Sequence, residues 1–208
     1  MTPSQFEQIT RRLKPQIEQI KESAHELHRS VCQTYDQHLP YGFHLDMVVE
    51  QIYKYGYCVC AREEDVLPLF FGGYYHDSIE DARLTYNDVV RVAKQYMNPE
   101  QAHMAAEIVY ALTNDKGRNR AERAGEKYYL GIRQTPYAPF VKLADRLANT
   151  SYSFGHSNPA NAHMKEVYRG ELPHFLQALS VQTDDIRFTL PADMVASITQ
   201  LVTDDDNQ

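Results

Sequence analysis

The stretch "YYHDSIEDA" (residues 74–82) contains four side chains that can do chemistry together. His76 and Asp77 are adjacent, and Glu80 and Asp81 follow within four residues. Imidazole and carboxylate groups bind divalent metal ions, and a mixed set suits manganese or iron better than structural zinc. A further carboxylate beside a metal-bound water can move protons during attack on phosphorus. The same residues also fit an ordinary polar helix end, so the interpretation depends on ligands from elsewhere in the chain.

Two other segments offer candidate ligands. His44 follows "LPYGF" at an expected helix start, and Asp145 lies within "VKLADRLANT". Asn149 comes four residues after Asp145, and residues at this spacing share one face of a helix. An octahedral ion has about six positions, of which His76 and Asp77 can fill two. His44 and Asp145 are therefore the candidates for a third and a fourth ligand.

A basic stretch interrupts an otherwise acidic chain. The net charge is −7, which argues against non-specific nucleic-acid binding because that requires a broadly basic surface. A local excess of positive charge on an acidic protein suits a small polyanion better than a duplex, and the alternative interpretation is an ordinary solvated helix face. Between residues 116 and 133 only Glu122 and Glu126 oppose Lys116, Arg118, Arg120, Arg123, Lys127 and Arg133.

Four motifs in a fixed order carry a family resemblance. "PYGFH" (40–44) looks like a Pro-Tyr-x-x-His motif, and "YYHDSIEDA" is similar to His-Asp-x-x-Glu-Asp. "LTNDKGRNRAER" (112–123) resembles a Thr-Asp-Asp-Lys stretch with its basic sequel, and "VKLADRLANT" (141–150) looks like Lys-Leu-Ala-Asp-Arg/Lys-Leu-x-Asn. Together they resemble the hydrolase domain of the RelA/SpoT family of HD-domain phosphohydrolases, especially the small stand-alone alarmone hydrolases. The resemblance covers about residues 38–170.

This resemblance implies a role for each matching residue. The metal ligands would be His44, His76, Asp77 and Asp145, with Mn²⁺ as the expected ion. Glu80 and Asp81 would form the catalytic pair that activates water and moves protons. The implied substrate contacts are Lys116, Arg118, Arg120 and Lys142, Asn149 on the sugar, and Tyr168.

The implied reaction is removal of the 3′-pyrophosphate from (p)ppGpp or a closely related alarmone. One departure leaves the base open: the family has an Arg-Lys pair before Pro-Tyr, and here no Arg or Lys lies between Arg29 and His44. Tyr35 or His38 could stack on a base instead. A phosphatase acting on another nucleotide, such as an NADPH-like 2′- or 3′-phosphate or a nucleoside monophosphate, is the alternative. A non-catalytic nucleotide sensor is a third possibility.

The elements that must position these residues are predicted to be helices. Apolar spacing predicts helices over 45–56, 63–78, 140–150 and 159–180, and over 4–37 either two helices or one kinked at Pro15. "TYND" (85–88) and "NPEQ" (98–101) are expected helix starts, and "PADMVASITQLV" (191–202) is an expected last helix. "DIRFTL" (185–190) is the only strand candidate. We therefore predict a single all-α domain over residues 1–208, an HD-type helical bundle with a metal site between helices.

The ends of the chain match no motif. Residues 1–36 and 184–208 are expected to be an N-terminal and a C-terminal extension that serve packing or oligomerisation, so a homo-oligomer is possible. The histidines of the first segment, His25 and His28, are expected on a solvated helix face. The aromatic run "FFGGYY" (70–75) is expected to pack in the core.

The remaining composition predicts a cytoplasmic protein. No apolar run approaches the roughly 20 residues of a membrane span, and the N-terminus has no apolar signal-peptide core. Cys32, Cys58 and Cys60 are odd in number and lack metal-type spacing, so they are expected to be buried, unreactive thiols in a reducing compartment. The expected partner is a small nucleotide, with no nucleic acid and no membrane.

Overall fold

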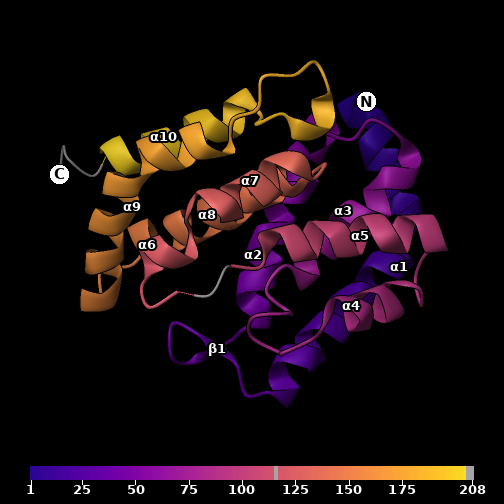
Figure 1. The fold of residues 1–208 in the computed structure, drawn as a ribbon, viewed down its shortest axis with the longest axis horizontal. Coiled ribbons are helices and arrows are strands. Elements are labelled where there is room, and N and C mark those ends of the chain that lie inside the picture. Colours follow the sequence, from indigo (N-terminus) through magenta and orange to yellow (C-terminus); the bar gives the residue numbers. More distant parts are fainter. Residues whose placement is uncertain (115–116, 205–208) are drawn as a thin grey trace.

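The computed structural model describes residues 1–114 and 117–204, and this part of the chain is helical apart from one short hairpin (Figure 1). The predicted all-α class is therefore confirmed. The elements are α1 (Pro3–Ser30), β1 (Thr34–Tyr35), β2 (Leu39–Pro40), α2 (Gly42–Tyr55), α3 (Val66–Tyr75), α4 (Tyr86–Ala93), α5 (Pro99–Leu112), α6 (Arg120–Arg123), α7 (Glu126–Gln134), α8 (Ala138–Gly155), α9 (Pro159–Leu179) and α10 (Ala192–Asp204).

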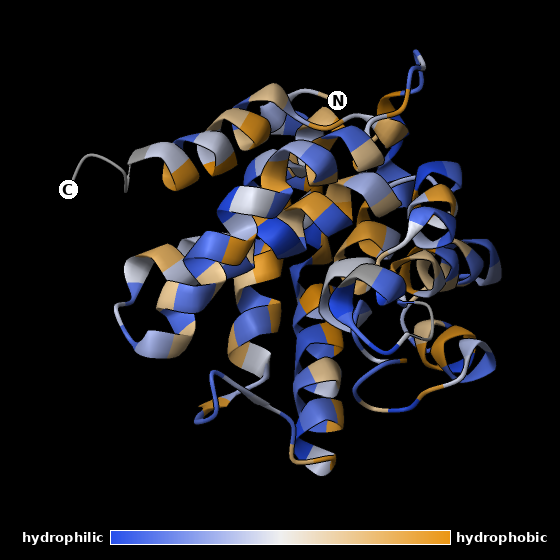
Figure 2. Cartoon of the chain, turned by 60° about the vertical axis from the view of Figure 1, so that its left-hand side comes forward, coloured by the Kyte–Doolittle hydropathy of each residue, from blue (hydrophilic) through white to orange (hydrophobic). Residues whose placement is uncertain are grey.

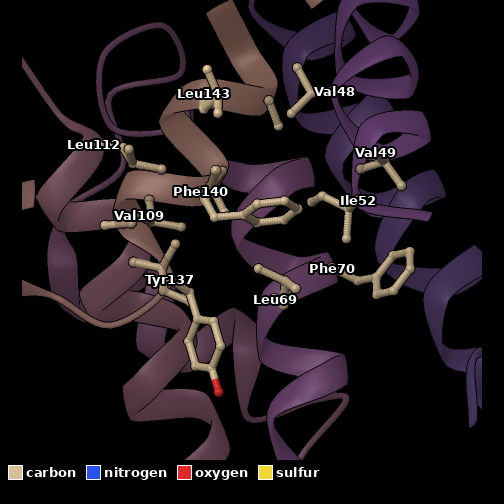
Figure 3. Close-up of a cluster of buried hydrophobic side chains, with 14 of the residues drawn as sticks. Val48, Val49, Ile52, Leu69, Phe70, Val109, Leu112, Tyr137, Phe140 and Leu143 are labelled. Atoms are coloured by element: carbon tan, nitrogen blue, oxygen red, sulfur yellow. The ribbon is translucent and has the colours of Figure 1, made fainter. Parts of the chain in front are cut away.

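Helix α8 is the centre of the bundle. It packs against α2, α9 and α10, while α3 packs against α1, α2 and α5. The side chains between α2, α3, α5 and the start of α8 form a continuous apolar cluster, in which the Phe140 ring of α8 points toward Ile52 of α2 (Figure 3). The same cluster of buried residues extends from Phe6 in α1 to Val202 in α10, so both ends of the chain contribute to one core.

The surface helices are amphipathic, with hydrophilic residues on their outward faces (Figure 2). Among the described residues, no helix combines the length and the apolar character needed to cross a membrane.

Two helix starts follow local capping rules. Thr85 accepts a hydrogen bond from the backbone N–H of Asp88, whose side chain accepts one in return from Thr85, and Asn98 and Gln101 form the same reciprocal pair. Each pair satisfies backbone donors that the first turn of a helix leaves unpaired. Both predicted starts are confirmed.

Helix α1 continues through Pro15, so the first segment is one helix instead of two. Pro15 is exposed, and apolar residues on both sides of it, such as Phe6 and Ile17, are buried in the core. Burial on both sides keeps the helix together although proline removes one hydrogen bond.

The strand prediction for "DIRFTL" is wrong. Residues Ile186–Phe188 form a 3₁₀ turn, which the Asp185 side chain caps by accepting a hydrogen bond from the backbone N–H of Arg187. The backbone carbonyl of Arg187 accepts from the N–H of Tyr137 at 2.7 Å, so this segment bonds to the start of α8 instead of to a strand. The pairing of β1 with β2 was not predicted, because two-residue strands have no alternation to detect.

The run "FFGGYY" is buried in α3, as predicted. A Cβ at Gly72 would lie 2.6 Å from Cγ2 of Ile108, and one at Gly73 would lie 2.4 Å from Cδ1 of Ile52. These two glycines therefore let α5 and α2 approach α3 closely.

The three thiols are free, but only Cys60 is fully buried. Cys58 is partly buried and Cys32 is exposed, so the prediction that all three are buried is wrong. Cys32 lies in the turn between α1 and the hairpin, where the chain crosses the surface.

Candidate metal centre

Two imidazoles and a carboxylate, from two helices and the end of a third, meet inside the bundle. His44 lies in the first turn of α2, His76 directly follows α3, and Asp145 lies in the middle of α8. His44 Nε2 is 3.3 Å from His76 Nε2 and 3.4 Å from Asp145 Oδ1, and His76 Nε2 is 3.8 Å from Asp145 Oδ1. These ligand atoms all lie within 4.8 Å of one another and could hold a metal ion.

Asp77 lies at the same centre. Its Oδ2 is 2.8 Å from His76 Nε2 and 3.6 Å from His44 Nε2, and it accepts a hydrogen bond from the Tyr41 hydroxyl. The sequence predicted that the helix would continue to residue 78, but α3 ends at Tyr75 and Asp77 lies in the turn that follows. The predicted set His44, His76, Asp77 and Asp145 is thus brought together in space.

The donor set suits a divalent cation. His76 Nδ1 donates to the carbonyl of Gly73 at 2.9 Å, which leaves the lone pair of Nε2 facing the other ligands. Burial opposes a charge on His44, but its hydrogen bonds with Asp145 and Asp77 outweigh burial and raise its pKa to about 9. Two nearly buried carboxylates thus draw positive charge to this centre, and a metal ion supplies such charge.

Polar side chains hold Asp145 from two sides. Lys142 Nζ donates to Oδ2 at 3.0 Å and Asn149 Nδ2 donates to Oδ1 at 2.6 Å, as expected for an i, i+4 pair. Burial alone would raise the pKa of Asp145, but Lys142 and His44 lower it well below its usual range. The Tyr35 hydroxyl in turn donates to Asn149 Oδ1 at 2.9 Å.

The predicted catalytic pair lies beside the metal centre and outside its ligand atoms. Both oxygens of Glu80 accept hydrogen bonds from Asn114, one from the backbone N–H at 2.6 Å and one from the side chain at 2.9 Å. Burial and the negative charge of Asp77 raise the pKa of Asp81 to about 6. A carboxyl group with this pKa can accept and return a proton near neutral pH.

The predicted substrate contacts fall into two places. Lys142 and Asn149 lie at the metal centre, whereas Arg120 and Tyr168 lie in a second cluster around Glu171. Arg118 is exposed, and its backbone N–H donates to Glu122, so the structure does not bring it to the metal centre. Lys116 lies outside the described residues.

One residue beside the centre lies in an environment that the sequence did not predict. His28, predicted on a solvated face, is fully buried and stacks on Tyr41 at 4.6 Å between ring centroids. Burial lowers its pKa to about 4. The spacing of Ile17, Ile20 and Ala24 extends to His28 along one helix face, and this pattern could have revealed it.

Comparisons with known proteins do not assign the chain to a family. A scan against protein-family models gives no match to the chain, and a search of curated proteins gives none either. The functional interpretation therefore depends on the geometry of the site and on the motif resemblance.

Proposed function

We propose that this protein is a metal-dependent phosphohydrolase that acts on a phosphorylated nucleotide. The observation that carries the proposal is the meeting of His44, His76, Asp77 and Asp145 from separate segments of the chain. Four ligand-type side chains with two imidazoles among them would be costly to bury together unless positive charge stabilised the carboxylates.

The four ligands would hold Mn²⁺, which when bound polarises a phosphate and lowers the pKa of a water. Around it, Lys142 fixes the orientation of Asp145, and Gly73 fixes the tautomer of His76. In the proposed reaction Asp81, with its raised pKa, takes a proton from the attacking water, and Asn114 orients Glu80, the neighbouring carboxylate. The roles of the four ligands and of Glu80 and Asp81 are those that the motif resemblance implies.

The proposed substrate is (p)ppGpp or a closely related alarmone, with release of the 3′-pyrophosphate. The composition of the β1–β2 hairpin is relevant to the alternative function, a phosphatase acting on another nucleotide. The hairpin carries no Arg or Lys that could read guanine, its Tyr35 ring stacks on His44 at 5.1 Å and 8°, and His38 is exposed. A base bound beside the hairpin would receive no cationic contact from it. We therefore expect the enzyme to accept a wider range of bases than guanine.

A substrate panel tests the proposal. The purified protein with Mn²⁺ is incubated with ppGpp, GTP, NADPH and nucleoside monophosphates, and released pyrophosphate and orthophosphate are measured. Pyrophosphate from ppGpp alone supports the alarmone reaction, and orthophosphate from another nucleotide supports the alternative. Thermal stabilisation by a nucleotide without turnover of any would instead indicate a sensor.

Site-directed variants test whether the activity arises at these residues. Asp77→Ala and Glu80→Ala should each lower kcat by at least about a hundredfold, whereas Glu50→Ala, an exposed acid on α2, should leave it unchanged. Full activity in both site variants would show that the chemistry occurs elsewhere.

A further inference from the structure

A second site adjoins the metal centre. A cavity of about 560 Å³ opens between α6, α7, α8 and α9, a volume within the range of small-molecule sites. Its cationic side chains outnumber its carboxylates by four to two. The cations are Arg120, Arg123, Lys142 and Arg146, and the carboxylates are Glu126 and Glu171.

The cavity and the metal centre share a wall. Lys142 lines the cavity while its Nζ bonds to Asp145 at 3.0 Å, and Arg146 is the next residue after Asp145. Asn114, which holds Glu80, also lines the cavity. A molecule bound at the metal centre could therefore extend into the cavity.

Glu171 pairs with two of the three arginines that line this cavity, Arg120 and Arg146. Arg120 donates to both of its oxygens, from Nε at 2.7 Å and from Nη2 at 3.0 Å. Arg146 donates to the same carboxylate at 2.9 Å. A guanidinium makes the same two-pronged contact with a phosphate.

Aromatic rings hold Arg146 in place in addition to Glu171. The Arg146 guanidinium lies 4.2 Å from the ring centre of Phe175 and 5.0 Å from that of Tyr168, and its side chain is nearly buried. The Arg120 guanidinium lies 5.9 Å from the centre of the Tyr168 ring, which Arg146 also contacts. A guanidinium fixed in this way loses little freedom when an anion replaces the carboxylate, so Arg146 is a preorganised anion contact.

We infer that this cavity binds a second phosphate or diphosphate group of the nucleotide whose reacting phosphate lies at the metal centre, and that Glu171 occupies the phosphate position until the nucleotide displaces it. The link to a nucleotide rests on the proposed function. The binding of a phosphate anion in the cavity does not.

Binding of inorganic pyrophosphate tests the cavity by itself. Isothermal titration in EDTA removes any contribution from a bound metal. Glu171→Gln should tighten binding about tenfold because it frees both arginines, and Arg120→Gln should weaken it by at least about tenfold. Arg120 is half exposed, so its replacement leaves no cavity in the core.

Two matched controls separate a phosphate position from general charge. Glu126 lines the same cavity but pairs with Arg133, which does not line it. Glu126→Gln therefore removes the same charge and frees no cavity arginine, and Arg91→Gln removes a remote arginine on α4. Equal effects of Glu171→Gln and Glu126→Gln, or unchanged binding in Arg120→Gln with an unchanged melting temperature, would overturn the inference.

Steady-state kinetics test whether the anion bound in the cavity is a second phosphate group of the nucleotide substrate. Arg120→Gln should raise KM about tenfold for a nucleoside 3′,5′-bis(diphosphate) and leave KM for the matching 3′-diphosphate unchanged. An equal change for both substrates would overturn the link to a second phosphate of the nucleotide. Absence of turnover of any nucleotide, with pyrophosphate binding still dependent on Arg120, would overturn the proposed function and support the anion site.

Discussion

Tyr35 connects two of the candidate metal ligands to the hairpin. Its ring stacks on His44, and its hydroxyl holds Asn149, which holds Asp145. The neighbouring Asp36 accepts a hydrogen bond from the Tyr152 hydroxyl at 2.7 Å and so fastens the hairpin to α8. The orientation of the ligands therefore depends on a residue that lies outside the four motifs.

Tyr35→Phe should lower the affinity for Mn²⁺ by about tenfold, because residues that orient metal ligands typically contribute 10–100-fold. The variant keeps the ring on His44 and removes only the hydroxyl bond to Asn149. Titration of free Mn²⁺ by electron paramagnetic resonance measures the affinity without any assay of turnover.

Tyr53→Phe is the matched control, since Tyr53 is an exposed tyrosine of α2 that contacts Phe70. Equal Mn²⁺ affinity in wild type and Tyr35→Phe would show that the hydroxyl has no role in positioning the ligands.

His28 predicts a pH-dependent stability. Its folded pKa of about 4 lies below the unfolded value of about 6.5, so the unfolded chain binds the proton more tightly. Stability from this residue is complete above pH 6.5 and is lost as the pH falls toward 4. The groups that face it are Asp77, His76, His44 and His25.

The measurement is urea unfolding of wild type and His28→Phe at pH 7.5 and pH 4.5. Relative to the variant, wild type should lose about 2 kcal/mol between the two values. The comparison cancels the titration of the other groups, and an equal pH dependence in both proteins would contradict the assignment.

At the scale of elements, the packing around a helix determines how replacing one of its glycines changes the stability of the protein. Gly72 and Gly170 both lie within helices, but only Gly72 faces a neighbour, since a Cβ at Gly170 would meet nothing within 4 Å. Gly170→Ala should stabilise the protein by about 0.5–1 kcal/mol through helix propensity. Gly72→Ala should destabilise it by about 1–3 kcal/mol, because Cγ2 of Ile108 is 2.6 Å from the new Cβ and lies close to the α5 backbone.

Urea unfolding of both variants checks this pair. Stabilisation by Gly72→Ala would show that α5 moves away from α3 at little cost, and a loss of stability in Gly170→Ala would contradict the open position in α9.

At the scale of the whole molecule, the candidate metal centre joins α2, the end of α3 and α8. Mn²⁺ at about one hundred times its dissociation constant should stabilise the fold by about 2.7 kcal/mol. For a chain of this size that corresponds to a rise in melting temperature of about 5–10 °C.

Thermal unfolding with Mn²⁺ and with EDTA measures the rise. Asp145→Asn keeps the shape of the side chain and removes a ligand charge, so its melting temperature should respond little to Mn²⁺. An equal rise in both proteins would place the metal elsewhere.

The sequence by itself determined the helical class, the capped starts at Thr85 and Asn98, and the four candidate ligands. Caps and helix periodicity are local, so neighbouring residues are enough to specify them. The four motifs indicated ligands because residue type and order along the chain limit which side chains can bind metal.

The tertiary structure decided what depends on contacts between distant segments. It buried His28 beneath Tyr41, brought the turn residue Asp77 to the metal centre, and paired Glu171 with Arg120 fifty-one residues away. It also made "DIRFTL" a 3₁₀ turn, because the backbone carbonyl of Arg187 bonds to the N–H of Tyr137 and no strand of the described chain pairs with this segment. Such pairings follow from how helices pack against one another, and no local pattern encodes them.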